Sequence, residues 1–173
     1  MSSYITDEGL VLKKMSYRDN KQLISIFSKS NGKVIVSAYG AMKPTSKKIS
    51  HLETGNVIKF SCHERHEYLY LHETDLLYAH SAIKEDENKL DVMFSMFLIL
   101  DKIVPEFQEE EDMYQSTLNF LRRLHNGNMT QKDTQQYFVD LLEIGGYIDP
   151  AKPHFPLEDI QKHIPKLLRG QVM

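Results

Sequence analysis

The sequence predicts an α+β protein, with a small five-stranded β-barrel in residues 1–80 and an all-α helical domain in residues 81–173. Two observations predict this fold class. Residues 1–80 hold short runs of apolar and β-branched residues that are separated by polar turns, which is typical of strands. After residue 80, apolar residues recur at every third or fourth position, which is typical of amphipathic helices.

Five runs predict the strands, at residues 9–13, 23–27, 34–39, 57–62 and 68–72. Turn residues at 16–20 separate the first two, and Asn31-Gly32 supplies the positive φ of a tight turn before the third. Residues 40–55 are polar and basic, and they predict a long loop. Closing five short strands into a barrel removes exposed strand edges, so a barrel is the expected arrangement.

Four helices are expected in the second half of the chain. The first, at 88–104, carries an apolar stripe and stops at Pro105; an acidic loop at 109–112 then leads into a helix containing Leu118, Leu121 and Leu124. Thr130 is positioned to cap the third helix, which Gly145-Gly146 ends. The proline-rich stretch 150–156 precedes a last short helix at 157–168.

Composition excludes several classes of protein. With 173 residues, 41% of them hydrophobic, the chain has ample material for a core, and its single cysteine, Cys62, cannot close an intrachain disulfide. The N-terminus lacks the pattern of a secretory signal, and the longest apolar run, 96–100, is too short to span a bilayer. We therefore expect a cytoplasmic protein with no membrane partner.

Charge divides between the two halves of the chain. The net charge is −3, but residues 1–80 hold 11 basic against 8 acidic residues, whereas residues 81–173 hold 10 against 16. The barrel half is therefore the expected nucleic-acid face. OB-fold barrels bind single strands with a basic groove and aromatic stacking platforms. The candidate DNA-binding residues near turns are Lys13, Lys14, Tyr17, Arg18, Lys21, Tyr39, Lys43, Lys47 and Lys48. The alternative is that surface lysines cluster here by chance.

Other chemistry has weaker signals. The segment Cys62-His63-Glu64-Arg65-His66, with His72 nearby, contains metal-ligand residue types, but strand alternation would place His63 on the face opposite to Cys62. Ordinary strand-end residues, with Cys62 in the core, are the preferred interpretation. No nucleophile elbow and no phosphate-binding loop is present, so we expect no enzyme activity, no catalytic residue, no metal and no cofactor.

A partner groove is a further hypothesis for the helical half. Met-rich apolar surfaces can hold a peptide, and flanking arginines would attract an acidic one. The residues assigned to this groove are Met93, Phe97, Leu121, Arg122 and Arg123. The alternative for the apolar members is ordinary core packing.

Several segments together resemble the RecO family. They are residues 8–13, then 20–24, Phe27 and 32–34, then 38–46, Leu52 and the strand from Val57; residues 141–147 (Leu-Leu-Glu-Ile-Gly-Gly-Tyr) look like the helix-to-Gly-Tyr segment of that family's helical domain. This chain departs from the family pattern at Tyr39 and Met42, because members of the family frequently have Lys and Arg around this loop. The chain is also shorter than typical members and lacks the cysteine zinc module that some of them carry.

The resemblance implies an OB-fold barrel, a helical domain and a non-catalytic role in DNA repair. It implies binding to single- and double-stranded DNA, annealing of single strands, and recombinase loading with RecR on DNA coated by single-strand-binding protein. The alternative function is a protein-interaction adaptor that holds RecR or the C-terminal tail of single-strand-binding protein with little direct DNA contact.

Overall fold

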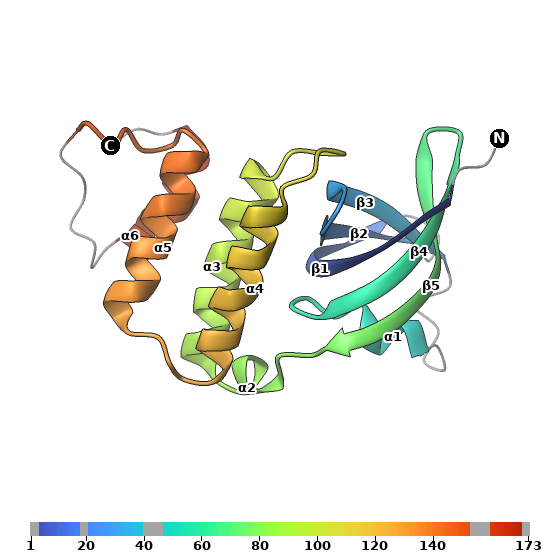
Figure 1. Cartoon of the computed structure of the whole chain (residues 1–173), viewed down its shortest axis with the longest axis horizontal. Helices are drawn as coiled ribbons and strands as arrows, with labels where there is room; N and C mark the ends of the chain where they lie inside the picture. Colours follow the sequence, from blue (N-terminus) through green and yellow to red (C-terminus); the bar gives the residue numbers. More distant parts are fainter. Residues whose placement is uncertain (1–3, 18–20, 40–46, 153–159, 171–173) are drawn as a thin grey trace. The chain divides into compact units, whose positions relative to one another are not determined.

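The computed structural model describes residues 4–17, 21–39, 47–152 and 160–170 (Figure 1). It divides into two compact units, one formed by Met1–His80 with Val104–Thr117 and the other by Ser81–Ile103 with Leu118–Met173. The division into domains 1–80 and 81–173 stays a prediction. The grouping of Val104–Thr117 with the strands was not expected from the sequence.

The first unit is built on five strands, β1 (Tyr4–Tyr17), β2 (Lys21–Ser28), β3 (Gly32–Tyr39), β4 (Val57–Arg65) and β5 (Tyr68–Tyr78). They pair in the order β1-β2-β3-β5-β4 and close into a barrel, because β4 also pairs with β1. Every pairing is antiparallel except the parallel one between β3 and β5. The predicted α+β fold with an OB-type barrel is confirmed, although β1 and β5 are longer than predicted.

Strand β1 closes the barrel by pairing with two strands. Its first half pairs with β4 and its second half with β2, and Gly9 is paired with both Ile58 and Ser28. A Cβ atom at Gly9 would lie 2.4 Å from Cγ2 of Ile26 and 3.0 Å from the carbonyl oxygen of Phe27. A residue without a side chain is therefore required where β1 passes from one partner to the other.

The barrel interior is a single apolar cluster. Inward-facing side chains from all five strands are buried there, together with Leu52 from the β3–β4 connection; they include Val11, Ile24, Val36, Phe60, Cys62 and Leu69. Burial of each large side chain in this cluster stabilises the fold by roughly 1.5–3 kcal/mol. Alternation then directs the intervening residues to the outer face.

A short helix replaces part of the predicted loop at residues 40–55. Helix α1 spans Lys47–His51, and residues 40–46 lie outside the described part of the chain. The side-chain amide of Asn56 donates to the carbonyl oxygens of Ser50 and His51, at 2.8 and 3.0 Å, which satisfies the end of the helix. The prediction of an uninterrupted loop was wrong because these side-chain contacts, which stabilise a helix of only five residues, leave no periodic pattern.

Residues 104–117 cover part of the outer face of the barrel. Tyr114 is fully buried and meets the ring of Phe27 edge-on, with ring centroids 5.3 Å apart. Burial raises the pKa of the Tyr114 hydroxyl, and the carboxylates of Glu8 and Asp7 raise this pKa further. The backbone N–H of Lys33 donates to the carbonyl oxygen of Pro105 at 2.9 Å. These contacts account for the grouping of this segment with the strands.

The second unit is helical. It contains α2 (Ser81–Lys84), α3 (Glu87–Ile103), most of α4 (Glu111–His125), α5 (Gln131–Ile144) and α6 (Ile160–Leu167). Helices α3, α5 and α6 pack against one another, and Phe120 of α4 stacks on Tyr137 of α5 with ring centroids 4.4 Å apart. The short helix α2 was not predicted. The last helix was predicted at 157–168; α6 spans Ile160–Leu167, and residues 153–159 lie outside the described part of the chain.

The predicted cap of α5 is confirmed. The Thr130 hydroxyl accepts from the backbone N–H of Asp133, and the Asp133 carboxylate accepts from the backbone N–H of Thr130, which completes a capping box. The helix ends at Gly145, and Gly146 follows with a φ of +73°. The acidic segment before α4 differs from its prediction, because Glu111 and Asp112 lie in the first helical turn, where carboxylates favour the positive end of the helix dipole.

Asp7 anchors the β2–β3 turn to β1. Its carboxylate accepts hydrogen bonds from the Ser28 hydroxyl, the backbone N–H of Ser30 and the side-chain amide of Asn31. Burial by itself raises the pKa of Asp7, but these bonds and one from the backbone N–H of Glu8 lower it more, so the net pKa lies below its ordinary value. The ionised carboxylate therefore stabilises the turn.

We predict that Asp7→Asn lowers the free energy of unfolding at pH 7 by about 1 kcal/mol, because one acceptor is lost from a partly exposed network. The folded pKa is lowered, so this contribution is present above the unfolded pKa of about 3.9 and is lost as pH falls through the folded value. Urea unfolding at pH 7 and pH 3 measures it. Asp75→Asn, at an exposed β5 carboxylate, is the control, and an equal effect of both substitutions at pH 7 would contradict the prediction.

Candidate nucleic-acid interface

Three predicted DNA-binding residues lie in one row across three strands. Tyr17 of β1 is paired with Lys21 of β2, and Lys21 is paired with Tyr39 of β3. Directly paired residues point to the same side of a sheet, so the three side chains share one face. The two rings are 62% and 67% exposed, which leaves them open to solvent.

The lysine in this row is held over one of the rings. The Nζ atom of Lys21 lies 5.6 Å from the centroid of the Tyr39 ring, within the range of a cation–π contact. This contact keeps a positive charge beside an exposed aromatic surface. A phosphate next to Lys21 and a base on Tyr39 or Tyr17 would satisfy both halves of the single-strand binding chemistry.

Lys13 and Lys14 extend the site along β1 in two directions. Lys13 has the same strand parity as Tyr17, four residues away, and its side chain is exposed. Lys14 is paired with Ile24, whose side chain lies in the barrel core, so Lys14 projects from the opposite face near the end of the barrel and is exposed there. Only Lys13 therefore shares the face of the Tyr17–Lys21–Tyr39 row.

The remaining predicted residues are placed less directly. The Nζ atom of Lys48 donates to the carbonyl oxygen of His72, which ties α1 to β5. Lys47 begins α1, and its side chain lies outside the described part of the chain. Arg18 and Lys43 also lie outside the described residues.

The partner groove assigned from the sequence requires correction. Met93, Phe97 and Leu121 are at most 3% exposed, so they belong to the packed interior of the helical unit and do not line an open surface. The side chain of Arg122 donates to Asn119, and Arg123 pairs with Asp133 at 3.4 Å. Apolar residues at helical spacing are typical of a buried helix face, and these residues lie on such a face.

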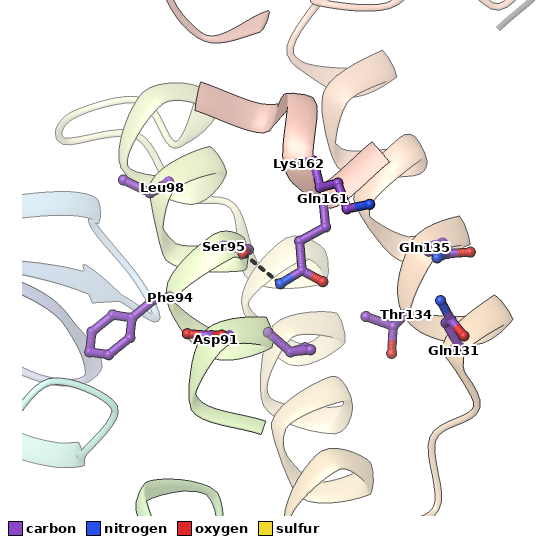
Figure 2. A pocket seen from close by; sticks show the side chains of 10 residues that line it. Asp91, Phe94, Ser95, Leu98, Gln131, Thr134, Gln135, Gln161 and Lys162 are labelled. Atoms are coloured by element: carbon purple, nitrogen blue, oxygen red, sulfur yellow. Dashed lines mark hydrogen bonds between the residues drawn. The ribbon is translucent and has the colours of Figure 1, made fainter. Parts of the chain in front are cut away.

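An open cleft lies instead on the other side of α3. It has a volume of about 720 Å³ and is lined by residues of α3, α5 and α6, which are Asp91, Val92, Phe94, Ser95, Leu98, Gln131, Thr134, Gln135, Gln161 and Lys162 (Figure 2). Phe94 and Leu98 are 45% and 50% exposed, one helical turn apart. Gln161 donates to the Ser95 hydroxyl at 3.0 Å, which joins α6 to α3 within the cleft.

Sequence reasoning missed this cleft, although a signal was present. Phe94 and Leu98 are four residues apart, and Asp91 precedes them by one turn, so the three share a face that differs from that of Met93 and Phe97. A charged residue on the same helix face as two apolar residues indicates that this face of the helix is exposed to solvent.

The cysteine region has the environment of a core residue and not of a reactive site. Cys62 is fully buried, and burial raises the pKa of its thiol to about 11. His63 lies on the outer face of β4, between the rings of Tyr4 and Tyr70. Among the described residues, no group of three or more histidine, cysteine or carboxylate side chains is arranged to hold a metal ion.

The Tyr17–Lys21–Tyr39 row lies in a part of the chain that is similar to known proteins. Residues 1–80 match the family described as "Recombination protein O N terminal". This segment belongs to the RecO family. The RecO resemblance predicted from the sequence is therefore confirmed.

Similarity to RecO proteins continues beyond this segment. The chain is 24% identical over 146 residues to the DNA repair protein RecO of Acetivibrio thermocellus, covering 84% of this chain and 58% of that protein. It is 25% identical over 139 residues to the protein of the same name from Listeria monocytogenes, covering 80% and 54%. For the Thermoanaerobacter protein the values are 28% over 107 residues, 62% and 43%. The chain thus spans about half the length of the RecO proteins it matches.

Within the part of the chain that the structure describes, no helix is both long enough and apolar enough to cross a membrane.

We predict that Cys62 of the folded protein does not react with a thiol reagent at pH 8, because its thiol is buried and its pKa of about 11 keeps it protonated. In denaturing urea, one thiol per chain should react, since Cys62 is the only cysteine. Lys59→Cys, at an exposed position of the same strand, provides a folded control that should react at an ordinary rate. Equal labelling rates at both positions would show that the barrel interior opens to the reagent.

Proposed function

We propose that this chain is a non-catalytic DNA-repair protein that binds single-stranded DNA through its barrel. The observation that carries the proposal is the Tyr17–Lys21–Tyr39 row, which places a cation between two exposed aromatic rings on one sheet face. In OB-type barrels this combination binds phosphates and stacks bases, with each stacked base contributing roughly 1–3 kcal/mol.

The wider role follows from the relatives and forms part of the same proposal. The matched proteins are named DNA repair protein RecO, which supports a role in repair and recombination. We propose that the chain anneals single strands, also contacts double-stranded DNA, and assists recombinase loading with RecR on DNA coated by single-strand-binding protein. Since binding of this kind needs only positioned charges and rings, no cofactor enters the proposal.

DNA binding is tested by fluorescence anisotropy with a labelled single-stranded oligonucleotide over a range of salt concentrations. The logarithm of the binding constant should fall linearly with the logarithm of salt concentration, by about 0.7 for each phosphate contact. Lys21→Ala should weaken binding and reduce this slope by roughly 0.7, because it removes one phosphate contact. Tyr39→Leu should weaken binding while leaving the slope unchanged, because a ring makes no ionic contact.

The matched control is Lys166→Ala, which removes the same charge from an exposed position on α6 in the helical unit. It should bind as the unchanged protein does. If Lys166→Ala and Lys21→Ala have the same effect, the attraction is a property of overall charge and the barrel row is not the binding site.

Peptide binding in the helical unit is a second candidate function, favoured by the cleft. Phe94 and Leu98 offer apolar surface, and Lys162 lies at the same cleft. We propose that it accepts an acidic peptide with apolar side chains, such as the C-terminal tail of single-strand-binding protein. Apolar side chains of the peptide would cover Phe94 and Leu98, and Lys162 would attract its carboxylates.

Calorimetric titration with that tail peptide tests the cleft. Leu98→Asp should weaken binding at least about tenfold, because it places a negative charge on the apolar contact. Leu77→Asp, at a similarly exposed residue of β5, should leave binding unchanged. Unchanged affinity of the Leu98→Asp protein would exclude the cleft as the peptide site.

A further inference from the structure

A second row of aromatic side chains crosses the other three-strand face of the barrel. Tyr4 of β1 is paired with His63 of β4, and His63 is paired with Tyr70 of β5. The ring centroids of Tyr4 and His63 are 6.0 Å apart, and those of His63 and Tyr70 are 5.5 Å apart with an interplanar angle of 22°. None of these three residues belongs to the proposed DNA site.

This second row faces outward. In β5 the residues on either side of Tyr70, Leu69 and Leu71, are buried in the barrel core, so Tyr70 points to the outside. In β4 the same alternation places Cys62 inside and His63 outside. Tyr4 is 68% exposed. His63 and Tyr70 are half-buried, so the three rings lie on the outer surface and are not a piece of the core, with Tyr4 the most open of them.

The two rows meet at the seam between β3 and β5. Ser37 of β3 is paired with Tyr70, and Ser37 lies two residues before Tyr39, on the same face of β3. The paired positions therefore form a path around the barrel. The path runs from Tyr17 through Lys21 to Tyr39. It continues on β3 at Ser37 and passes through Tyr70 and His63 to Tyr4. It passes through all five strands, and it begins and ends on β1 because the barrel is closed.

Charge limits where a nucleic-acid strand could run on this second face. Next to the aromatic row, toward the middle of β4 and β5, lies a hollow of about 360 Å³. Tyr4 of the row lines it together with Glu73, Asp75 and Lys59. The two acids disfavour phosphates there. At the hairpin end, Arg65 is paired with Tyr68, and both are exposed. A strand that crosses the row with its phosphates toward the hairpin would meet Arg65 and stay away from Glu73 and Asp75, while Glu64 and Glu67 are also exposed at the hairpin end.

We propose that the Tyr4–His63–Tyr70 row is a second base-stacking surface, which receives the continuation of a single DNA strand bound at the Tyr17–Lys21–Tyr39 row. This inference rests on the proposed function and adds the path of the strand across the β3–β5 seam. Five inter-strand steps of about 4.8 Å give a path of roughly 24 Å along the sheet. OB-type barrels bind about 4–16 nucleotides, which suits a path longer than one row.

The first test compares oligothymidylates of increasing length on three proteins. The double variant Tyr4→Leu/Tyr70→Leu keeps apolar bulk but removes two rings, so its affinity for the longer oligonucleotides should fall about tenfold or more. Its affinity for the shortest oligonucleotide that binds should stay unchanged, because the first row remains. Tyr78→Leu, a matched change at the far end of β5, should behave as the unchanged protein.

The second test does not depend on loss of binding. The chain contains no tryptophan, so Tyr70→Trp introduces a single tryptophan into the row, whose emission can be excited apart from that of the tyrosines. Its emission should be quenched by a long oligothymidylate and should not be quenched by an oligonucleotide of the same length with abasic sugars, because only bases stack. Tyr78→Trp provides the control at an exposed position outside the row.

The outcomes separate this inference from the proposed function. If Tyr17→Leu/Tyr39→Leu weakens binding while Tyr4→Leu/Tyr70→Leu does not, and tryptophan at position 70 is not quenched, DNA binding at the first row stands and the second row is rejected. If the unchanged protein binds no single-stranded DNA at low salt, the proposed function and this inference both fail. Equal quenching by normal and abasic strands would also overturn base stacking at the second row.

Discussion

The barrel depends on one steric constraint, which is the space around Gly9. At this residue β1 is bonded to β2 and β4 at once, and a Cβ atom would lie 2.4 Å from Cγ2 of Ile26. Because Gly9 leaves this space free, one strand can pair with both neighbours and supply both closing pairings. The two ends of β1 then carry Tyr17 and Tyr4 to the two aromatic rows. The position of the candidate interface is thus a consequence of barrel closure.

Packing decides which part of the outer barrel face remains open. Tyr114 covers Phe27, and Pro105 is bonded to Lys33, so the segment at 104–117 uses the surface of β2 and β3 near their connecting turn. Asp7 holds that same turn through Ser28, Ser30 and Asn31. The opposite ends of these strands carry Lys21 and Tyr39, and the ring of Tyr39 is exposed there.

Sequence periodicity was sufficient for the strands and the longer helices, but it was insufficient for the short helices and for the sites. Alternation and turn residues predicted the five strands, and Thr130 with Gly145 and Gly146 marked both ends of α5. The contacts that hold α1, from Asn56 to the carbonyl oxygens of Ser50 and His51, leave no such pattern. The rows also depend on strand register, which pairs Lys21 with Tyr39 and His63 with Tyr70 and cannot be read from spacing alone. Apolar spacing placed Met93 and Phe97 on a helix face but did not show that this face is buried.

The pairing of β3 with β5 has a mechanical consequence. Among the described residues, this parallel ladder joins two residue pairs, Val36 with Leu69 and Ser37 with Tyr70, whereas β1 and β4 are joined over seven pairs. Local opening of a barrel begins where the fewest hydrogen bonds must break, so amide hydrogens along this seam should exchange before those of the other ladders. A molecule that lies across the seam and binds only the closed barrel would slow that exchange. The β3–β5 seam is therefore the place where the barrel opens most easily, and it is also where a bound molecule would slow hydrogen exchange most.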